Sequence, residues 1–186
     1  MFPVIPILFL LLATGVGCGV VKMLSGKKTL ITGPKLSGKT TFIQHISKEK
    51  IPDGPSGAPR SFKVKDAMLN EVTDFSGDAS WLKSRFNEYI KDHDYILFFF
   101  DTSEYIKDEP YRVQTNARID MIHRNVNSSQ KVLIIGTHID KLSGSYKADI
   151  ERFFAGKSYQ SVLNHIVYVD TTKKECVETI INELKR

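Results

Sequence analysis

Apolar runs alternate with amphipathic segments along the chain, which predicts that strands alternate with helices. Continuous apolar runs rich in β-branched and aromatic residues are typical of strands covered on both faces of a parallel sheet. Such runs lie at residues 28–32, 95–101, 131–137 and 165–170. Two further stretches, 61–65 and 68–73, alternate polar and apolar residues. They predict an antiparallel hairpin at one edge of the sheet.

Helical spacing of apolar residues recurs in five segments between or after these runs. The predicted helices cover residues 41–47, 81–91, 110–127, 148–155 and 175–185. The longest is polar, and its candidates for the inward face are Val113, Ala117, Ile119, Met121 and Ile122. Strands that alternate with helices predict an α/β fold of three layers, in which helices cover both faces of a mostly parallel six-stranded sheet. The 186 residues suffice for one such domain, which we assign to residues 28–186.

The first 21 residues differ from the rest, because no charged side chain occurs from Phe2 to Val21. About 20 such residues suffice to cross a bilayer as a helix. Three interpretations compete: a cleaved signal peptide, a lipoprotein signal at Cys18, and an uncleaved anchor. A signal peptide normally begins with basic residues, and none precedes this apolar run. We therefore favour a transmembrane anchor over residues 1–21, followed by a short linker at residues 22–27.

Lysines that follow the anchor predict its orientation. Lys22, Lys27 and Lys28 favour a single-pass protein with its amino terminus outside and its domain in the cytoplasm. Gly15 and Gly19 form a G-x-x-x-G pattern, which permits two membrane helices to pair and therefore allows dimerisation. Glycine that is simply tolerated near a helix end is the commoner explanation of this pattern.

Charge and cysteine content narrow the expected partners. The net charge is +5, and an excess of lysine and arginine suits an anionic membrane surface. No basic run is interleaved with aromatic residues, so nucleic acid is not an expected partner. Cys18 lies in the predicted anchor and Cys176 in the last helix, which leaves no disulfide within the domain and fits a reducing cytosol.

The chemistry of the chain begins at residues 33–40, which read G-x-x-x-x-G-K-T between a predicted strand and a predicted helix. Backbone N–H groups and the positive end of the helix converge at such a loop and stabilise an anion. Lys39 is placed to reach the β- and γ-phosphates, and the Thr40 hydroxyl is suited to Mg²⁺. The predicted phosphate-binding residues are Gly33, Pro34, Lys35, Leu36, Ser37, Gly38, Lys39, Thr40 and Thr41.

Further polar residues follow the other strands, at the edge where ligands bind in such sheets. Asp74 is suited to hold Mg²⁺ directly or through water, and the N–H of Gly77 can approach the γ-phosphate. After the fifth strand, Asp140 can accept hydrogen bonds from the N1–H and the amino group of guanine. Adenine offers no such pair of donors, so Asp140 predicts guanine specificity. A carboxylate that merely caps the strand is the alternative.

The order of these motifs resembles the small GTPases of the Ras and Arf superfamily over residues 28–186. The phosphate loop matches completely, as does D-x-x-G with Asp74 and Gly77. The guanine motif N-K-x-D matches in part, with Thr137, His138 and Asp140 in its positions.

Two looser matches complete the resemblance. Thr172 and Lys173 stand in the S-A-K-like loop, and Ser56 stands where the family carries a magnesium-binding threonine. The resemblance implies a P-loop GTPase fold that binds GTP or GDP with Mg²⁺. An amino-terminal anchor followed at once by such a domain also resembles the layout of the signal-recognition-particle receptor β subunit.

Two departures from the family pattern bear on function. Asp78 replaces the glutamine that orients the attacking water. A carboxylate cannot donate the hydrogen bond of the amide, and its negative charge is unfavourable near the γ-phosphate. With Lys39 and Gly77 as the other catalytic candidates, we expect slow hydrolysis or help from an activating protein. His138 replaces a lysine whose stem packs along guanine, so we expect weakened base selectivity.

The sequence therefore predicts a membrane-tethered GTP switch that recruits a protein effector. The alternatives are a constitutively GTP-bound scaffold, which Asp78 favours, and a P-loop ATPase or kinase, which leaves Asp140 without a role.

Overall fold

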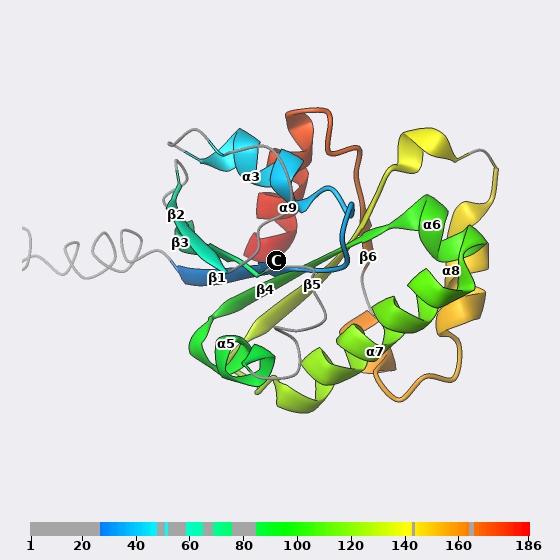
Figure 1. The fold of residues 1–186 in the computed structure, drawn as a ribbon, viewed down its shortest axis with the longest axis horizontal. Helices are drawn as coiled ribbons and strands as arrows, with labels where there is room; N and C mark the ends of the chain where they lie inside the picture. The colour runs from blue at the N-terminus through cyan, green and yellow to red at the C-terminus, as the bar shows by residue number, and fades with distance from the viewer. Residues whose placement is uncertain are drawn as a thin grey trace, which may run out of the picture.

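A six-stranded, mostly parallel sheet forms the centre of the computed structural model, which describes residues 27–47, 51, 59–64, 69–75, 85–142, 144–163 and 166–186 (Figure 1). The strand order is β2-β3-β1-β4-β5-β6. The strands are β1 (Lys27–Thr32), β2 (Arg60–Lys63), β3 (Leu69–Asp74), β4 (Tyr95–Asp101), β5 (Lys131–Thr137) and β6 (Ile166–Tyr168). The β2–β3 pair is antiparallel and lies at one edge, whereas the other pairings are parallel. The predicted edge hairpin and parallel core are confirmed.

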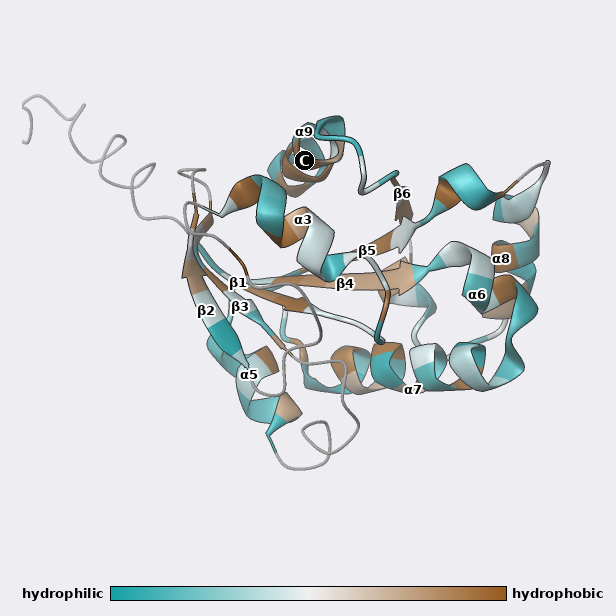
Figure 2. Ribbon diagram, turned by 45° about the horizontal axis from the view of Figure 1, so that its top comes forward, coloured by the Kyte–Doolittle hydropathy of each residue, from teal (hydrophilic) through white to brown (hydrophobic). Residues whose placement is uncertain are grey.

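Helices cover both faces of this sheet. They are α3 (Lys39–Ile46), α5 (Phe86–Asp92), α6 (Thr102–Lys107), α7 (Glu109–Asn125), α8 (Tyr146–Phe154) and α9 (Glu175–Lys185), with short 3₁₀ turns η1 (Ile139–Lys141) and η2 (Gln160–Leu163). α3 and α9 lie on one side of the sheet, and α5 and α7 lie on the other (Figures 1 and 2). The three predicted layers are therefore present.

β4 shows why the sequence builds two cores. Its side chains alternate between the faces, so Leu97 and Phe99 pack in the cluster with α3 and α9. Ile96, Phe98 and Phe100 pack in the other cluster, with α5, α7 and α8. A strand covered on both faces is apolar along nearly all of its length, as the hydropathy colouring of β4 shows (Figure 2), and only Asp101 at its end is charged.

The inward face of α7 differs from its prediction. Ile119 and Ile122 are buried as expected, but Val113 is 60% exposed and Ala117 is exposed, so both assignments were wrong. The buried face of α7 follows residues 115, 118, 119 and 122, at the i, i+3, i+4, i+7 spacing of one helical stripe. Arg118 occupies the middle of that stripe, and a charged residue gives no apolar signal in the sequence.

Other differences concern the ends of elements. The helix α6 was missed, because it has only six residues and follows β4 without a loop. Lys27 belongs to β1 rather than to the linker, and β6 ends at Tyr168. The predicted anchor and the rest of its linker lie outside the described residues, as does Trp81 at the start of the predicted second helix. Across the part of the chain that the structure describes, no helix combines the length and apolar character needed to cross a membrane.

Candidate nucleotide site

The phosphate loop, residues 33–40, joins β1 to α3 and depends on two glycines. Gly33 has a φ of 143°, and a Cβ there would lie 2.0 Å from the carbonyl oxygen of Phe99 in β4. Gly38 has a φ of 81°, and a Cβ there would lie 2.8 Å from the hydroxyl oxygen of Thr171. At these two positions the loop therefore lies too close to its neighbours, the Phe99 backbone and the Thr171 side chain, to leave room for a Cβ atom. At its tip, Leu36 has a φ of 62° and is 88% exposed.

Lys39 turns back into the phosphate loop. Its ammonium group donates to the carbonyl oxygens of Gly33, at 3.0 Å, and Pro34, at 2.6 Å. It also lies 3.2 Å from the hydroxyl oxygen of Ser37. The side chain is only 8% exposed, so a cation is held at the centre of the loop by neutral acceptors.

Burial makes this cation costly. It lowers the pKa of Lys39 to about 8 from the usual 10.5. The negative charge of Asp74 opposes this shift, and the positive charge of Arg118 adds to it. An anion placed against Lys39 would therefore favour its charged form and offset the cost of its burial.

Asp74 ends β3 beside the loop. The residue is buried and pairs in register with Ile31 of β1 and Arg60 of β2. Thr40 lies in the first turn of α3, whose amino terminus has no side-chain cap among the described residues. A hydroxyl and a buried carboxylate at this edge supply the oxygen donors that Mg²⁺ prefers. The other predicted metal ligand, Ser56, lies outside the described residues, as do Gly77 and Asp78.

Residues 137–141, which we call the base segment after their predicted role, follow β5 at the same edge of the sheet. The Thr137 hydroxyl is completely buried, 3.1 Å from the carbonyl oxygen of Ser37 and 3.0 Å from that of Phe100. It therefore connects the base segment to the phosphate loop. Asp140 lies in the exposed turn η1, where its carboxylate is accessible to a ligand.

A second loop reaches the phosphate loop from the end of β6. Thr171 is buried, and its carbonyl oxygen accepts a hydrogen bond of 3.0 Å from His45 Nε2 in α3. Thr172 donates to Asp170 through its backbone N–H, at 3.0 Å, and its hydroxyl, at 2.6 Å, and these bonds are the main cause of a lowered Asp170 pKa. Lys173 pairs with the same carboxylate at 3.5 Å. Asp170 therefore shapes the loop that carries both predicted residues.

Comparison with solved structures places this arrangement among known folds. A chain of bacterial selenocysteine-specific elongation factor EF-Sec matches with a TM-score of 0.62 and 19% identity over 86% of this chain, which spans 28% of that protein. The Arl6 (BBS3) small GTPase from Trypanosoma brucei, with the bound nucleotide analogue GppNp, matches at 0.63 and 15% identity, over 87% of this chain and 96% of that one. A probable GTP-binding protein engB matches at 0.65 and 10%, over 85% and 96%.

The chain has the fold of P-loop GTPases. No protein-family model matches the sequence, and no curated protein matches it either. The likeness to these solved structures therefore shows the fold alone.

Within this GTPase fold, the structure adds residues that the sequence analysis missed. Asp101 and Thr102, at the junction of β4 and α6, contact the base segment. Arg118 is 1% exposed and acts electrostatically on Lys39. A carboxylate at the end of an apolar run was a signal for Asp101, but nothing in the sequence pairs it with His138.

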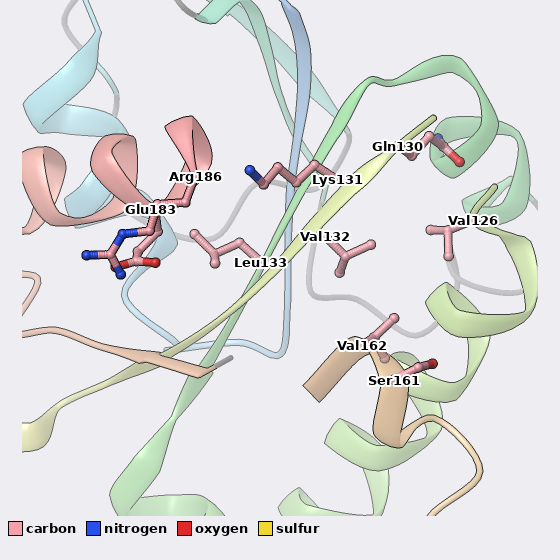
Figure 3. Close-up of a pocket in the computed structure, with 9 residues that line it drawn as sticks. All are labelled: Val126, Gln130, Lys131, Val132, Leu133, Ser161, Val162, Glu183 and Arg186. Atoms are coloured by element: carbon pink, nitrogen blue, oxygen red, sulfur yellow. The ribbon is translucent and has the colours of Figure 1, made fainter. Parts of the chain in front are cut away.

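A pocket of about 440 Å³ lies at the opposite edge of the sheet, near the start of β5 (Figure 3). Val126, Val132 and Val162 line it, and Lys131 at its rim donates a hydrogen bond of 2.9 Å to the Leu184 carbonyl oxygen. Ligands of parallel sheets bind at the carboxyl ends of strands, whereas this pocket is at the amino end of β5. We assign no ligand to it.

Proposed function

We propose that this protein binds GTP and GDP with Mg²⁺ and acts as a membrane-anchored, nucleotide-dependent switch. The observation that carries the proposal is the bond between Thr137 and the carbonyl oxygen of Ser37, which joins a phosphate loop to a segment that presents Asp140. Phosphate and base groups of one nucleotide would then be bound by one connected structure.

Phosphate binding rests on Lys39 and the start of α3. The buried ammonium group would exchange carbonyl partners for phosphate oxygens, and the amide groups of the first turn favour the same anion. Thr40 and Asp74 would hold Mg²⁺, with Ser56 as a further ligand, and the metal would neutralise phosphate charge when bound. Because the negative charge of Asp74 acts on Lys39 and partly offsets the cost of its burial, both groups belong to one electrostatic unit.

Base recognition rests on Asp140. Its exposed carboxylate would accept from the two adjacent donors of guanine, whereas adenine would present an acceptor and leave the charge unsatisfied. Thr172 and Lys173 lie in the loop that would approach the base from the other side, and His138 would lie beside it.

Hydrolysis is proposed to be slow or partner-assisted, because Asp78 stands where an amide would orient water. An arginine supplied by an activating protein raises such rates by on the order of 10³–10⁵. The anchor over residues 1–21 would hold the switch surface close to a membrane, where a protein effector distinguishes the GTP state from the GDP state. Equal effector binding to both states would contradict the switch.

Asp78 also favours a second candidate function, a scaffold that keeps GTP bound and recruits partners without turnover. Release of several equivalents of phosphate from excess GTP would exclude the scaffold. Failure to release more than one equivalent, with or without a membrane extract, would support it.

The deciding experiment measures binding of GTP, GDP and ATP, with Mg²⁺, to the full-length chain in mild detergent. We expect the wild type to prefer guanine nucleotides, and Asp140→Ala to reduce that preference by about 100-fold or more, because two hydrogen bonds to a charged group are lost. Asp92→Ala is the control, since Asp92 is an exposed partner of Lys28 near the amino ends of β1 and β4, whereas the site lies at the carboxyl ends of the strands. Equal or tighter binding of ATP by the wild type would overturn the proposal and favour an ATPase or kinase.

A further inference from the structure

Asp101 connects two elements that meet at the base end of the proposed site. It is the last residue of β4, only 3% exposed, and it precedes α6 as its amino-terminal cap. Its Oδ1 atom accepts hydrogen bonds from the backbone N–H groups of Ser103, at 2.8 Å, and Glu104, at 3.1 Å. One carboxylate oxygen is therefore used for capping.

The other carboxylate oxygen points to the base segment. Asp101 Oδ2 lies 3.2 Å from His138 Nδ1 and 3.9 Å from Lys141 Nζ. These two residues flank Asp140 in the chain, so one buried anion contacts both ends of the turn that presents Asp140. The adjacent Thr102 hydroxyl donates to the carbonyl oxygen of Thr137 and fixes the start of the same segment.

His138 needs such support. Its φ of 56° and ψ of 33° lie in the left-handed region, which costs a non-glycine residue about 1–2 kcal/mol. Conformations of this kind persist where surrounding contacts fix them. A carboxylate cannot donate at neutral pH, so Nδ1 carries the proton in the contact with Asp101. The same N–H lies 2.9 Å from the Thr137 hydroxyl oxygen.

We propose that Asp101 is a positioning residue for guanine recognition, because it holds His138 and Lys141 and thereby sets the place of Asp140. This inference rests on the proposed function. His138 provides most of the connection, because Lys141 is half exposed and its ion pair at 3.9 Å is weak.

Asp101→Asn separates this role from helix capping. Asparagine caps helices about as well as aspartate does, so its oxygen can keep the bonds to Ser103 and Glu104. Its amide NH₂ group would then face His138 Nδ1, which can accept from it only after the ring proton moves to Nε2. The helix is retained, whereas the contact with an anion is lost and at most a weaker neutral hydrogen bond replaces it.

The experiment compares GDP with inosine diphosphate, which lacks only the exocyclic amino group of guanine, on the full-length chain. In the wild type we expect tighter binding of GDP. In Asp101→Asn we expect this preference to fall roughly tenfold, the equivalent of one hydrogen bond to a charged group. A general loss of folding or of phosphate binding would weaken both nucleotides equally and leave the ratio unchanged.

Asp108→Asn is the matched control, because Asp108 caps α7 through Tyr111 N–H at 3.4 Å and, among the described contacts, none joins it to the base segment. We expect its GDP preference to equal that of the wild type. In a His138→Ala background, Asp101→Asn should lower the GDP preference much less than it does alone, because the effects of two residues that act through one contact are not additive. His138→Ala by itself, at a partly exposed loop position, should reproduce the lower ratio.

The outcomes separate the two proposals. If the wild type does not prefer guanine, or Asp140→Ala leaves its preference intact, the proposed function fails. If both behave as expected but Asp101→Asn keeps the wild-type ratio, the positioning role alone is overturned. Should Asp101→Asn fail to fold, a wild-type ratio in His138→Ala would overturn the role just as directly.

Discussion

The phosphate loop and the base segment lie at the same edge of the sheet but are held in place in different ways. The phosphate loop is held by its own residues, since Lys39 bonds to Gly33, Pro34 and Ser37 within a few positions. The base segment is held by residues far away in the sequence, with Asp101 and Thr102 as its supports. Substitutions within the phosphate loop therefore break the contacts that hold it. The base segment can carry a residue such as His138, because Asp101 outside the segment pairs with it.

The largest effect is expected where the phosphate loop holds its cation. Lys39→Met keeps the volume and removes the charge, so nucleotide affinity should fall by about 100-fold or more as contacts to two phosphates are lost. Stability without nucleotide should be unchanged or higher, because a buried charge is replaced by an apolar group. Titration calorimetry and chemical unfolding of the same variant check both halves. A variant that loses affinity only because it is unfolded would contradict the second half.

Lys39→Met also isolates the contribution of Lys39 to the pH dependence of the unfolding free energy. Burial lowers the pKa of Lys39 to about 8, so between pH 8 and 10.5 the unfolded chain binds more protons at this residue than the folded protein does. Stability without nucleotide therefore rises with pH across that window, by about 3 kcal/mol for this group. The difference in unfolding free energy between wild type and Lys39→Met should show the rise, since all other titrating groups are common to both.

The contrast between the two regions also explains what the sequence could predict. The strand-loop-helix context of residues 33–40 is contiguous, so the path of the phosphate loop followed from its pattern, as did the alternating burial of β4. The contact between Asp101 and His138 joins residues that are separated along the chain by α6, α7 and β5, and no period or motif encodes it. Likewise, the buried face of α7 contains Arg118 and leaves Val113 exposed, whereas the apolar pattern had predicted Val113 on that face.

A second test asks whether packing or backbone conformation prevents a side chain larger than glycine in the phosphate loop. Gly38 and Gly144 have nearly the same φ, 81° and 79°, but a Cβ at Gly38 meets Thr171 at 2.8 Å, whereas none of the described atoms lies within 4 Å of a Cβ at Gly144. We expect Gly144→Ala to cost about 1 kcal/mol for the left-handed conformation alone. Gly38→Ala should cost about 2–3 kcal/mol, because a clash is added. Thermal unfolding of both variants gives the difference, and equal losses would mean that Thr171 moves aside freely.

The smallest effect concerns the bond that joins the two regions. Thr137→Val removes a buried hydroxyl that reaches the carbonyl oxygens of Ser37 and Phe100, so stability should fall by about 1–2 kcal/mol. Thr115→Val is the matched control, because the Thr115 hydroxyl is equally buried and has no hydrogen-bond partner among the described residues. Its replacement should be neutral or stabilising.

Adding GDP tests whether Thr137→Val also affects nucleotide binding, in contrast to Thr115→Val. If the Thr137 hydroxyl couples the phosphate loop to the base segment, the stabilisation that saturating GDP gives should shrink in Thr137→Val and stay at the wild-type value in Thr115→Val. The change in melting temperature on adding GDP measures it for each variant. Equal stabilisation of both by GDP would mean that the two regions bind their parts of the nucleotide independently, and that Asp101 and Thr102 alone keep the base segment in register.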